Sequence, residues 1–166
     1  MRLVVADTGP LDYLVLIGES DLLPKLFEKV FVPEAVGAEL RHRAAPPSVR
    51  MWAEKPPAWL EVRPTPAATN DDPALRALDN GERAALALAR PLGADLILMD
   101  DRAGVAVARQ QSFAVTGTLG VLDLAARHGL IDLGAAFARL KTTNFRHSPE
   151  IMDALLAQHS SRRNEG

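Results

Sequence analysis

Five acidic residues in this sequence have the types and positions needed to share one metal ion. Asp7 and the pair Asp100 and Asp101 directly follow short apolar runs, whereas Glu39 and Glu82 lie in stretches with helical patterning. Two carboxylates about 4 Å apart repel each other by roughly 4 kcal/mol at an effective dielectric constant near 20. A protein that gathers several of them therefore requires a cation. Oxygen ligands in a chain without cysteine favour Mg²⁺ or Mn²⁺.

Asp7 ends the stretch around which the chain is organised, residues 3–10 (LVVADTGP). The apolar run at residues 3–6 is typical of a strand that is buried on both faces of a parallel sheet. In such sheets ligands bind at the carboxyl ends of the strands, which is where Asp7 would lie. The alternative is that Asp7 caps the helix expected at residues 11–17, a role that Thr8 could also fill.

The other four acids are expected at the same edge of the sheet. Residues 94–99 (ADLILM) form an apolar run that predicts a strand ending at Asp100 and Asp101. The carboxyl ends of parallel strands all face one way, so these acids and the first one share an edge. The helices that carry Glu39 and Glu82 can lean their carboxylates over that edge.

Each of these acids also has a purely structural interpretation, which the sequence leaves open. Asp79 and Glu82 have the spacing of a capping box at a helix start. Glu39 and Arg43 have the spacing of an ordinary ion pair on the exposed face of a helix. Asp101 could cap the helix that follows it.

The remaining patterning alternates between strands and helices, which predicts an α/β fold with a mainly parallel central sheet covered by helices on both faces. We expect one domain over residues 1–159, a turn-rich loop at 64–73 and a disordered tail at 160–166. The expected strands are residues 3–6, 30–32, 59–63, 94–99 and 113–115, and the expected helices are residues 11–17, 22–29, 34–43, 48–55, 81–90, 102–110, 119–128, 133–141 and 149–159.

The composition limits the class of protein. With 166 residues, of which 48% are hydrophobic, the chain can bury one continuous core. It contains no cysteine, which excludes disulfides, thiolate nucleophiles and cysteine zinc sites and fits a reducing cytoplasm. A net charge of −2 gives no general attraction to nucleic acid, so such binding would depend on local basic groups. We expect neither a signal peptide nor a membrane span.

The ordered set of motifs resembles the PIN-domain family. The set comprises a strand ending in D-T, a helix with V-P-E-x-V-x-x-E, a helix opening with G-E and a strand ending in D-D. More narrowly, it resembles a PIN-like group in which G-E-R-A-A, L-M-D-D-R and V-T-G-T-L-G-V-L occur together. The resemblance implies a three-layer α/β/α sandwich and metal-dependent endonuclease activity on RNA. Many such proteins are toxins of bacterial toxin–antitoxin pairs, each silenced by a small antitoxin protein.

The resemblance also implies roles for particular residues. The four acids of the family fall on Asp7, Glu39, Glu82 and Asp101, which are expected to be catalytic and to hold Mg²⁺ or Mn²⁺. Asp100, which is adjacent to Asp101, is a further expected metal ligand. This chain departs from many PIN nucleases in having Glu at the third position and M-D-D in place of T-x-D.

Substrate-binding residues are expected beside these acids. Thr8 matches the hydroxyl that often follows the first acid, and it would orient a metal-bound water or a carboxylate next to the substrate. Arg41, Arg43 and Arg102 adjoin acidic motifs and could bind phosphates, although solvated or ion-paired roles are equally open. Thr118 opens a helix whose amides could cradle a phosphate, or it could simply belong to a capped helix.

Single-stranded RNA is the expected substrate, because paired stems bury their base edges and hold their backbone stiffly. The main alternative is a PIN-like module that binds RNA or an antitoxin with little or no catalysis. A phosphatase is disfavoured, because Gly9 stands where such phosphatases place a second aspartate. A phospho-receiver domain is disfavoured, because it needs a lysine after a late strand and the last lysine, Lys141, lies in an expected helix. The apolar faces of the late helices exceed what one small sheet must cover, which favours a homodimer.

Overall fold

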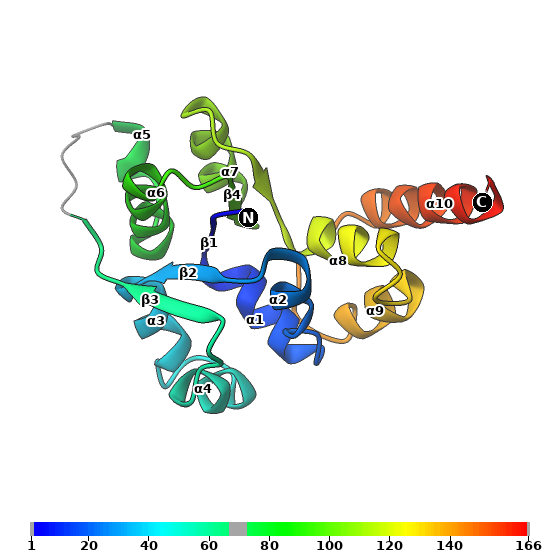
Figure 1. Cartoon of the computed structure of the whole chain (residues 1–166), viewed down its shortest axis with the longest axis horizontal. Helices are drawn as coiled ribbons and strands as arrows, with labels where there is room; N and C mark the ends of the chain where they lie inside the picture. Colours follow the sequence, from blue (N-terminus) through cyan, green and yellow to red (C-terminus); the bar gives the residue numbers. More distant parts are fainter. Residues whose placement is uncertain (1, 67–72, 166) are drawn as a thin grey trace.

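The computed structural model describes residues 2–66 and 73–165, and its centre is a parallel sheet (Figure 1). The sheet contains five strands: β1 (Val4–Ala6), β2 (Val30–Pro33), β3 (Leu60–Arg63), β4 (Leu96–Leu98) and β5 (Val115–Thr116). Their order is β3-β2-β1-β4-β5, and every pairing is parallel. The strand that ends at Asp7 therefore lies in the centre.

Helices cover both faces of this sheet (Figure 1). The described residues form α1 (Thr8–Leu16), α2 (Leu22–Phe27), α3 (Glu34–Arg41), α4 (Pro47–Glu54), α5 (Pro73–Arg76), α6 (Asn80–Leu92), α7 (Arg102–Gln110), α8 (Thr118–Arg127), α9 (Leu133–Leu140) and α10 (Pro149–Glu165). Apolar residues of α5, α6 and α7 pack on one face, and those of the other helices pack on the opposite face. This confirms the predicted three-layer α/β/α fold.

Strand β1 shows why its sequence is apolar throughout. Val4 and Ala6 pack into the core beneath α1 and α8, whereas Val5 packs into the core beneath α6 and α7. All three residues are fully buried. A strand in a three-layer sandwich has no exposed face, so alternation between apolar and polar residues is lost.

The strand order creates a crevice at the edge where the acids were expected. The chain leaves β1 toward β2 on one side, whereas it leaves β4 toward β5 on the other side. The point where the direction reverses is where open α/β sheets bind their ligands. Asp7 lies at this point, because its amide donates to the carbonyl oxygen of Leu98 at 2.9 Å and so continues the pairing of β1 with β4.

Several elements differ from the sequence-based expectation. Strand β5 is two residues long and begins at Val115, and the short helix α5 was not expected. Helix α10 continues to Glu165, whereas a disordered tail was expected from Ser160. The extra helical turns bring Arg162 Nη1 to 4.0 Å from Asp123 Oδ1. Of the turn-rich loop expected at 64–73, residues 67–72 lie outside the described part of the chain.

No helix in the described residues is long and apolar enough to cross a membrane.

Gly104 in α7 is explained by close packing. A Cβ atom at this position would lie 2.4 Å from Sδ of Met99, which is buried, and 3.5 Å from Cγ of Glu82. The helix can therefore approach the end of β4 only because residue 104 has no side chain. A glycine in a helix costs about 1 kcal/mol relative to alanine, and here the close approach offsets that cost.

We therefore expect Gly104→Ala to destabilise the protein by about 1–3 kcal/mol, because the overpacking outweighs the gain in helix propensity. The matched control is Gly134→Ala in α9, where the nearest atoms lie 3.5 and 4.0 Å from the added Cβ. The control should leave the stability unchanged or slightly raised. Urea denaturation of both variants measures this, and equal midpoints for the two would contradict the packing argument.

Candidate active site

Asp7 is nearly buried at the carboxyl end of β1, with 7% of its surface exposed. Burial raises its pKa from 3.8 to about 7. The amide of Thr8 partly lowers this pKa, whereas the negative charges of Asp79, Glu82 and Glu39 raise it further. Asp7 occupies the N-cap position of α1, but its side chain makes no capping hydrogen bond. The Asp7 carboxylate therefore does not cap α1, which favours a role for it in the crevice.

Glu39 is held against the start of two other helices. The hydroxyl of Thr8 at the start of α1 donates a hydrogen bond to Oε2 of Glu39. A Cβ atom on Gly81 at the start of α6 would lie 2.7 Å from Oε1 of Glu39. Arg43 lies beyond the end of α3, so the helical ion pair considered from the sequence does not form. Glu39 thus turns toward the crevice.

Glu82 has the capping role that its spacing predicts. Its amide donates to Oδ1 of Asp79 at 2.8 Å, and the Asp79 amide donates to Oε2 of Glu82 at 3.2 Å. The side chain is 6% exposed. Burial raises its pKa to about 7, and the negative charges of Asp79 and Asp101 contribute to the increase. The cap occupies one carboxylate oxygen and leaves Glu82 close to other acids.

The two acids after β4 are held by backbone amides. Oδ1 of Asp100 accepts from the amide of Thr118 at 2.7 Å, and Oδ2 accepts from the Thr118 hydroxyl at 2.7 Å. Burial raises the pKa of Asp100. Asp101 is exposed, and its Oδ2 accepts from the amide of Gly104 at 3.1 Å, which caps α7 as one interpretation of the sequence proposed.

Thr118 is a positioning residue in this structure. Its side chain is fully buried, and both its amide and its hydroxyl donate to Asp100. A Cβ atom on the preceding residue, Gly117, would lie 2.5 Å from Oδ1 of Asp100. The predicted phosphate cradle at the start of α8 is thus occupied by a carboxylate of the protein itself.

Two further acids belong to the site and were not assigned to it from the sequence. Asp79 was considered only as a cap, but its charge raises the pKa of Asp7. Asp12 lies one helical turn after Thr8 on α1. Its Oδ1 is buried without a hydrogen-bond partner among the described residues, and burial followed by the charge of Glu39 raises its pKa to about 6. The i,i+4 spacing from Thr8 was the available signal for Asp12.

We refer to these residues together as the acid cluster: Asp7, Asp12, Glu39, Asp79, Glu82, Asp100 and Asp101. Within the described residues, none of them forms an ion pair with an arginine, lysine or histidine. Over the same residues, no three acidic or histidine side chains are arranged as a preformed metal-ligand group. The donors are all oxygen and their charge is unneutralised, which fits a hard divalent cation that keeps part of its water shell.

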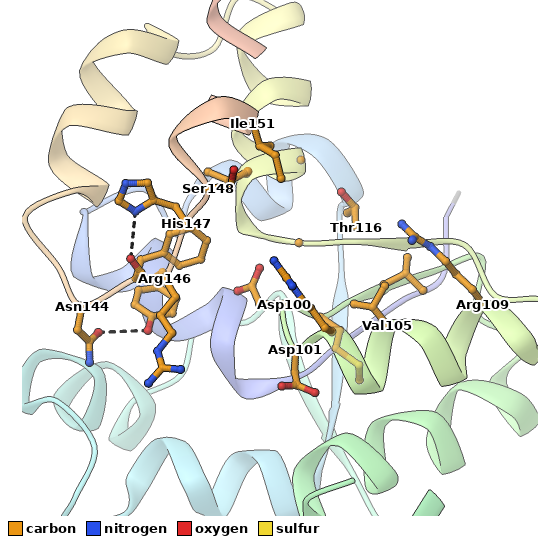
Figure 2. Close-up of a pocket in the computed structure, with 18 residues that line it drawn as sticks. Asp100, Asp101, Val105, Arg109, Thr116, Asn144, Arg146, His147, Ser148 and Ile151 are labelled. Atoms are coloured by element: carbon orange, nitrogen blue, oxygen red, sulfur yellow. Dashed lines mark hydrogen bonds between the residues drawn. The ribbon is translucent and has the colours of Figure 1, made fainter. Parts of the chain in front are cut away.

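A cleft of about 960 Å³ opens beside the acid cluster (Figure 2). Asp100, Asp101 and Arg102 line it at the end of β4. The other two arginines expected to bind phosphate do not line it: Arg41 folds back over Gly37 on α3, and Arg43 lies in the turn after α3.

The pKa of Asp7 predicts how the stability of the metal-free protein depends on pH. In the unfolded chain Asp7 ionises near pH 4, whereas in the folded protein it keeps its proton to about pH 7. Its contribution to stability is therefore complete below pH 4 and is lost as the pH rises from 4 to 7.

Asp7→Asn removes this charge at all pH values. We expect the variant to melt at least about 4 °C above the wild type at pH 8 in EDTA, with the difference shrinking toward pH 4. Asp153→Asn on the exposed side of α10 is the control, and its melting temperature should follow the wild type. A difference between Asp7→Asn and wild type that does not change with pH would refute this account.

A family model described as a PIN domain matches residues 3–161, which is nearly the whole chain. A search of curated proteins finds no match. PIN domains are generally metal-dependent nucleases. The extent of the match, together with the three-layer fold, shows that the chain belongs to the PIN-domain family.

Proposed function

We propose that this protein is an endoribonuclease that depends on Mg²⁺ or Mn²⁺ and cuts single-stranded RNA. The observation that carries the proposal is a set of unneutralised carboxylates at the switch point of the sheet, beside an open cleft. Switch points of α/β sheets bind ligands, and a buried acid with a raised pKa in such a crevice is typical of a functional site.

Four residues of the acid cluster would hold the cation: Asp7, Glu39, Glu82 and Asp101. Asp100, next to Asp101, would be a further ligand of the cation. Both of its carboxylate oxygens already accept a hydrogen bond from Thr118, which leaves each fewer lone pairs for a metal ion. A divalent cation bound there would acidify a coordinated water and offset the negative charge that develops on the scissile phosphate. The expected products are a 5′-phosphate and a 3′-hydroxyl.

The residues around these ligands restrict where the carboxylates can point. The Thr8 hydroxyl fixes Oε2 of Glu39, and the Gly104 amide fixes Oδ2 of Asp101. In each case one carboxylate oxygen accepts a hydrogen bond from the protein, and the second oxygen is left to bind the cation. Hydrogen bonds of this kind orient metal ligands and raise their affinity for the ion.

A ribonuclease assay with Mn²⁺ or Mg²⁺ tests the proposal directly. We expect Asp7→Asn and Asp101→Asn each to lower the cleavage of a single-stranded RNA by about a hundredfold or more, because each loses a charged ligand. Asp153→Asn should cleave as the wild type does. Cleavage at the wild-type rate by all the variants would rule out the site.

The second candidate is a module that binds RNA or an antitoxin with little or no catalysis. It is favoured by the capping roles of Glu82 and Asp101, which give both acids a structural purpose. Titration with Mn²⁺ separates the two candidates. A nuclease should gain melting temperature with Mn²⁺ and lose that gain in Asp7→Asn, whereas RNA binding without any response to Mn²⁺ would favour the binding module.

We also propose that the protein is the toxin of a toxin–antitoxin pair in the cytoplasm. The support is its membership of a family with nuclease-type function. Induced expression of the wild type in bacteria should arrest growth, and Asp7→Asn at the same protein level should not. Normal growth with active wild-type protein would contradict the toxin role but not the nuclease activity.

A further inference from the structure

We propose that the wall of the cleft formed by residues 144–148, between α9 and α10, binds an unpaired nucleotide next to the acid cluster. In this proposal Phe145 stacks on the base and Arg146 binds a phosphate. The inference deepens the proposed nuclease function and rests on it. It assigns to a segment far along the chain the task of presenting single-stranded RNA to the carboxylates at the end of β4.

The cleft joins this segment to the acid cluster. Its lining includes Asp100 and Asp101 at one side and residues 144–148 at the other (Figure 2). Arg146 and Arg109 are seen on opposite sides of the two carboxylates (Figure 2). A ligand that fills the cleft would thus contact the segment and the carboxylates at once. Its volume of about 960 Å³ falls in the range of small-molecule sites.

The segment presents aromatic rings that are fixed by their neighbours. The Phe145 ring packs edge-on against Tyr13, with centroids 4.9 Å apart and planes at 76°. The His147 ring lies parallel to Phe145 at 6.5 Å. The Tyr13 hydroxyl donates to Oδ1 of Asn144 at 3.1 Å, which ties the segment to α1. Phe145 and His147 thus form a positioned aromatic surface in an open cleft.

Aromatic surfaces of this kind stack on nucleic acid bases without strong sequence preference. Stacking needs a base that is splayed out of any helix, so the surface suits single-stranded RNA rather than a duplex. His147 is exposed and Phe145 is half-buried, so neither residue is closed off from the cleft by the core. The His147 ring is held in place by a hydrogen bond between its Nδ1 and the carbonyl oxygen of Phe145 at 3.2 Å.

Three arginines in the same cleft have their charge available for phosphates. Arg102, Arg109 and Arg146 line it, and within the described residues none of their guanidinium groups forms an ion pair or a hydrogen bond. Elsewhere, Arg127 and Arg139 each pair with a carboxylate. Free guanidinium groups bind phosphate oxygens in a bidentate manner.

The three arginines supply local positive charge, which RNA binding requires because the chain as a whole is not basic. The chain carries a net charge of −2, so RNA is not attracted by the protein as a whole. The acid cluster would in addition repel a phosphate chain. Local arginines on both sides of the carboxylates would hold the RNA backbone across them, while the base rests on the aromatic surface.

Binding of a short fluorescein-labelled single-stranded RNA, measured by anisotropy in EDTA, tests this inference apart from cleavage. We expect Phe145→Leu to weaken binding about tenfold, since leucine keeps the apolar packing against the core but loses the stacking face. Phe145→Tyr should restore binding. Arg146→Ala should weaken binding at least fivefold and lower the salt dependence by about one phosphate contact.

The matched control for Arg146 is Arg163→Ala on α10, which lies outside this cleft. The control should bind within twofold of the wild type. Unchanged binding in Phe145→Leu and Arg146→Ala, an equal loss in Arg163→Ala, or tighter binding of duplex RNA than of single-stranded RNA would each overturn the inference. Absence of cleavage with Mn²⁺ would instead count against the proposed function, because the binding measurement contains no metal.

Discussion

The concentration of negative charge between the ends of β1 and β4 is the constraint on which the rest of this structure depends. Asp7 and Glu82 are nearly buried, and burial raises the pKa of both to about 7. Within the described residues no basic side chain pairs with either of them. The site therefore holds protons below about pH 7 and needs a cation once those protons are lost as the pH rises. The free energy of unfolding depends on whether protons or a cation are bound.

Glycines allow the backbone to close around these carboxylates. The start of α6 comes so near to Glu39 that a side chain at Gly81 would overlap its carboxylate, and Gly117 stands in the same relation to Asp100. Alanine at either position would push a carboxylate away from the crevice. Gly81 and Gly117 therefore help to shape the site, although neither has a side chain that could bind a metal ion or RNA.

The sequence predicted the elements of the fold and the edge at which the acids gather. Both predictions relied on local signals, namely apolar runs that end in an acid and helical periodicity between them. The contribution of residues 144–148 could not be predicted in this way. That segment lies between two helices at the end of the chain, and it reaches the cleft only through tertiary contacts such as the hydrogen bond of Tyr13 with Asn144.

The surroundings of two residues could not be inferred from the sequence, for a related physical reason. Thr118 was expected to face a phosphate, but its donors are used by Asp100, because β5 places the start of α8 directly beside the end of β4. Asp12 was not assigned to the site because its i,i+4 spacing from Thr8 is, by itself, an ordinary relationship between two residues of a helix. Only the packing of α1 against α3 brings its carboxylate near Glu39. Spacing identifies which acids share an edge, but not which donors they find there.

The capping and metal-binding interpretations of Glu82 and Asp101 are compatible. Each accepts one backbone hydrogen bond through one carboxylate oxygen, and each lies at the amino end of a helix. Such helix ends carry about half a positive charge, which stabilises a nearby carboxylate by roughly 0.3–1 kcal/mol. Helix α1 also begins at this edge, beside Asp7. These helix ends allow the acids to gather without arginine or lysine. Their partial charges are too small to balance several full negative charges, so the fold makes the cluster tolerable while leaving it able to attract a cation.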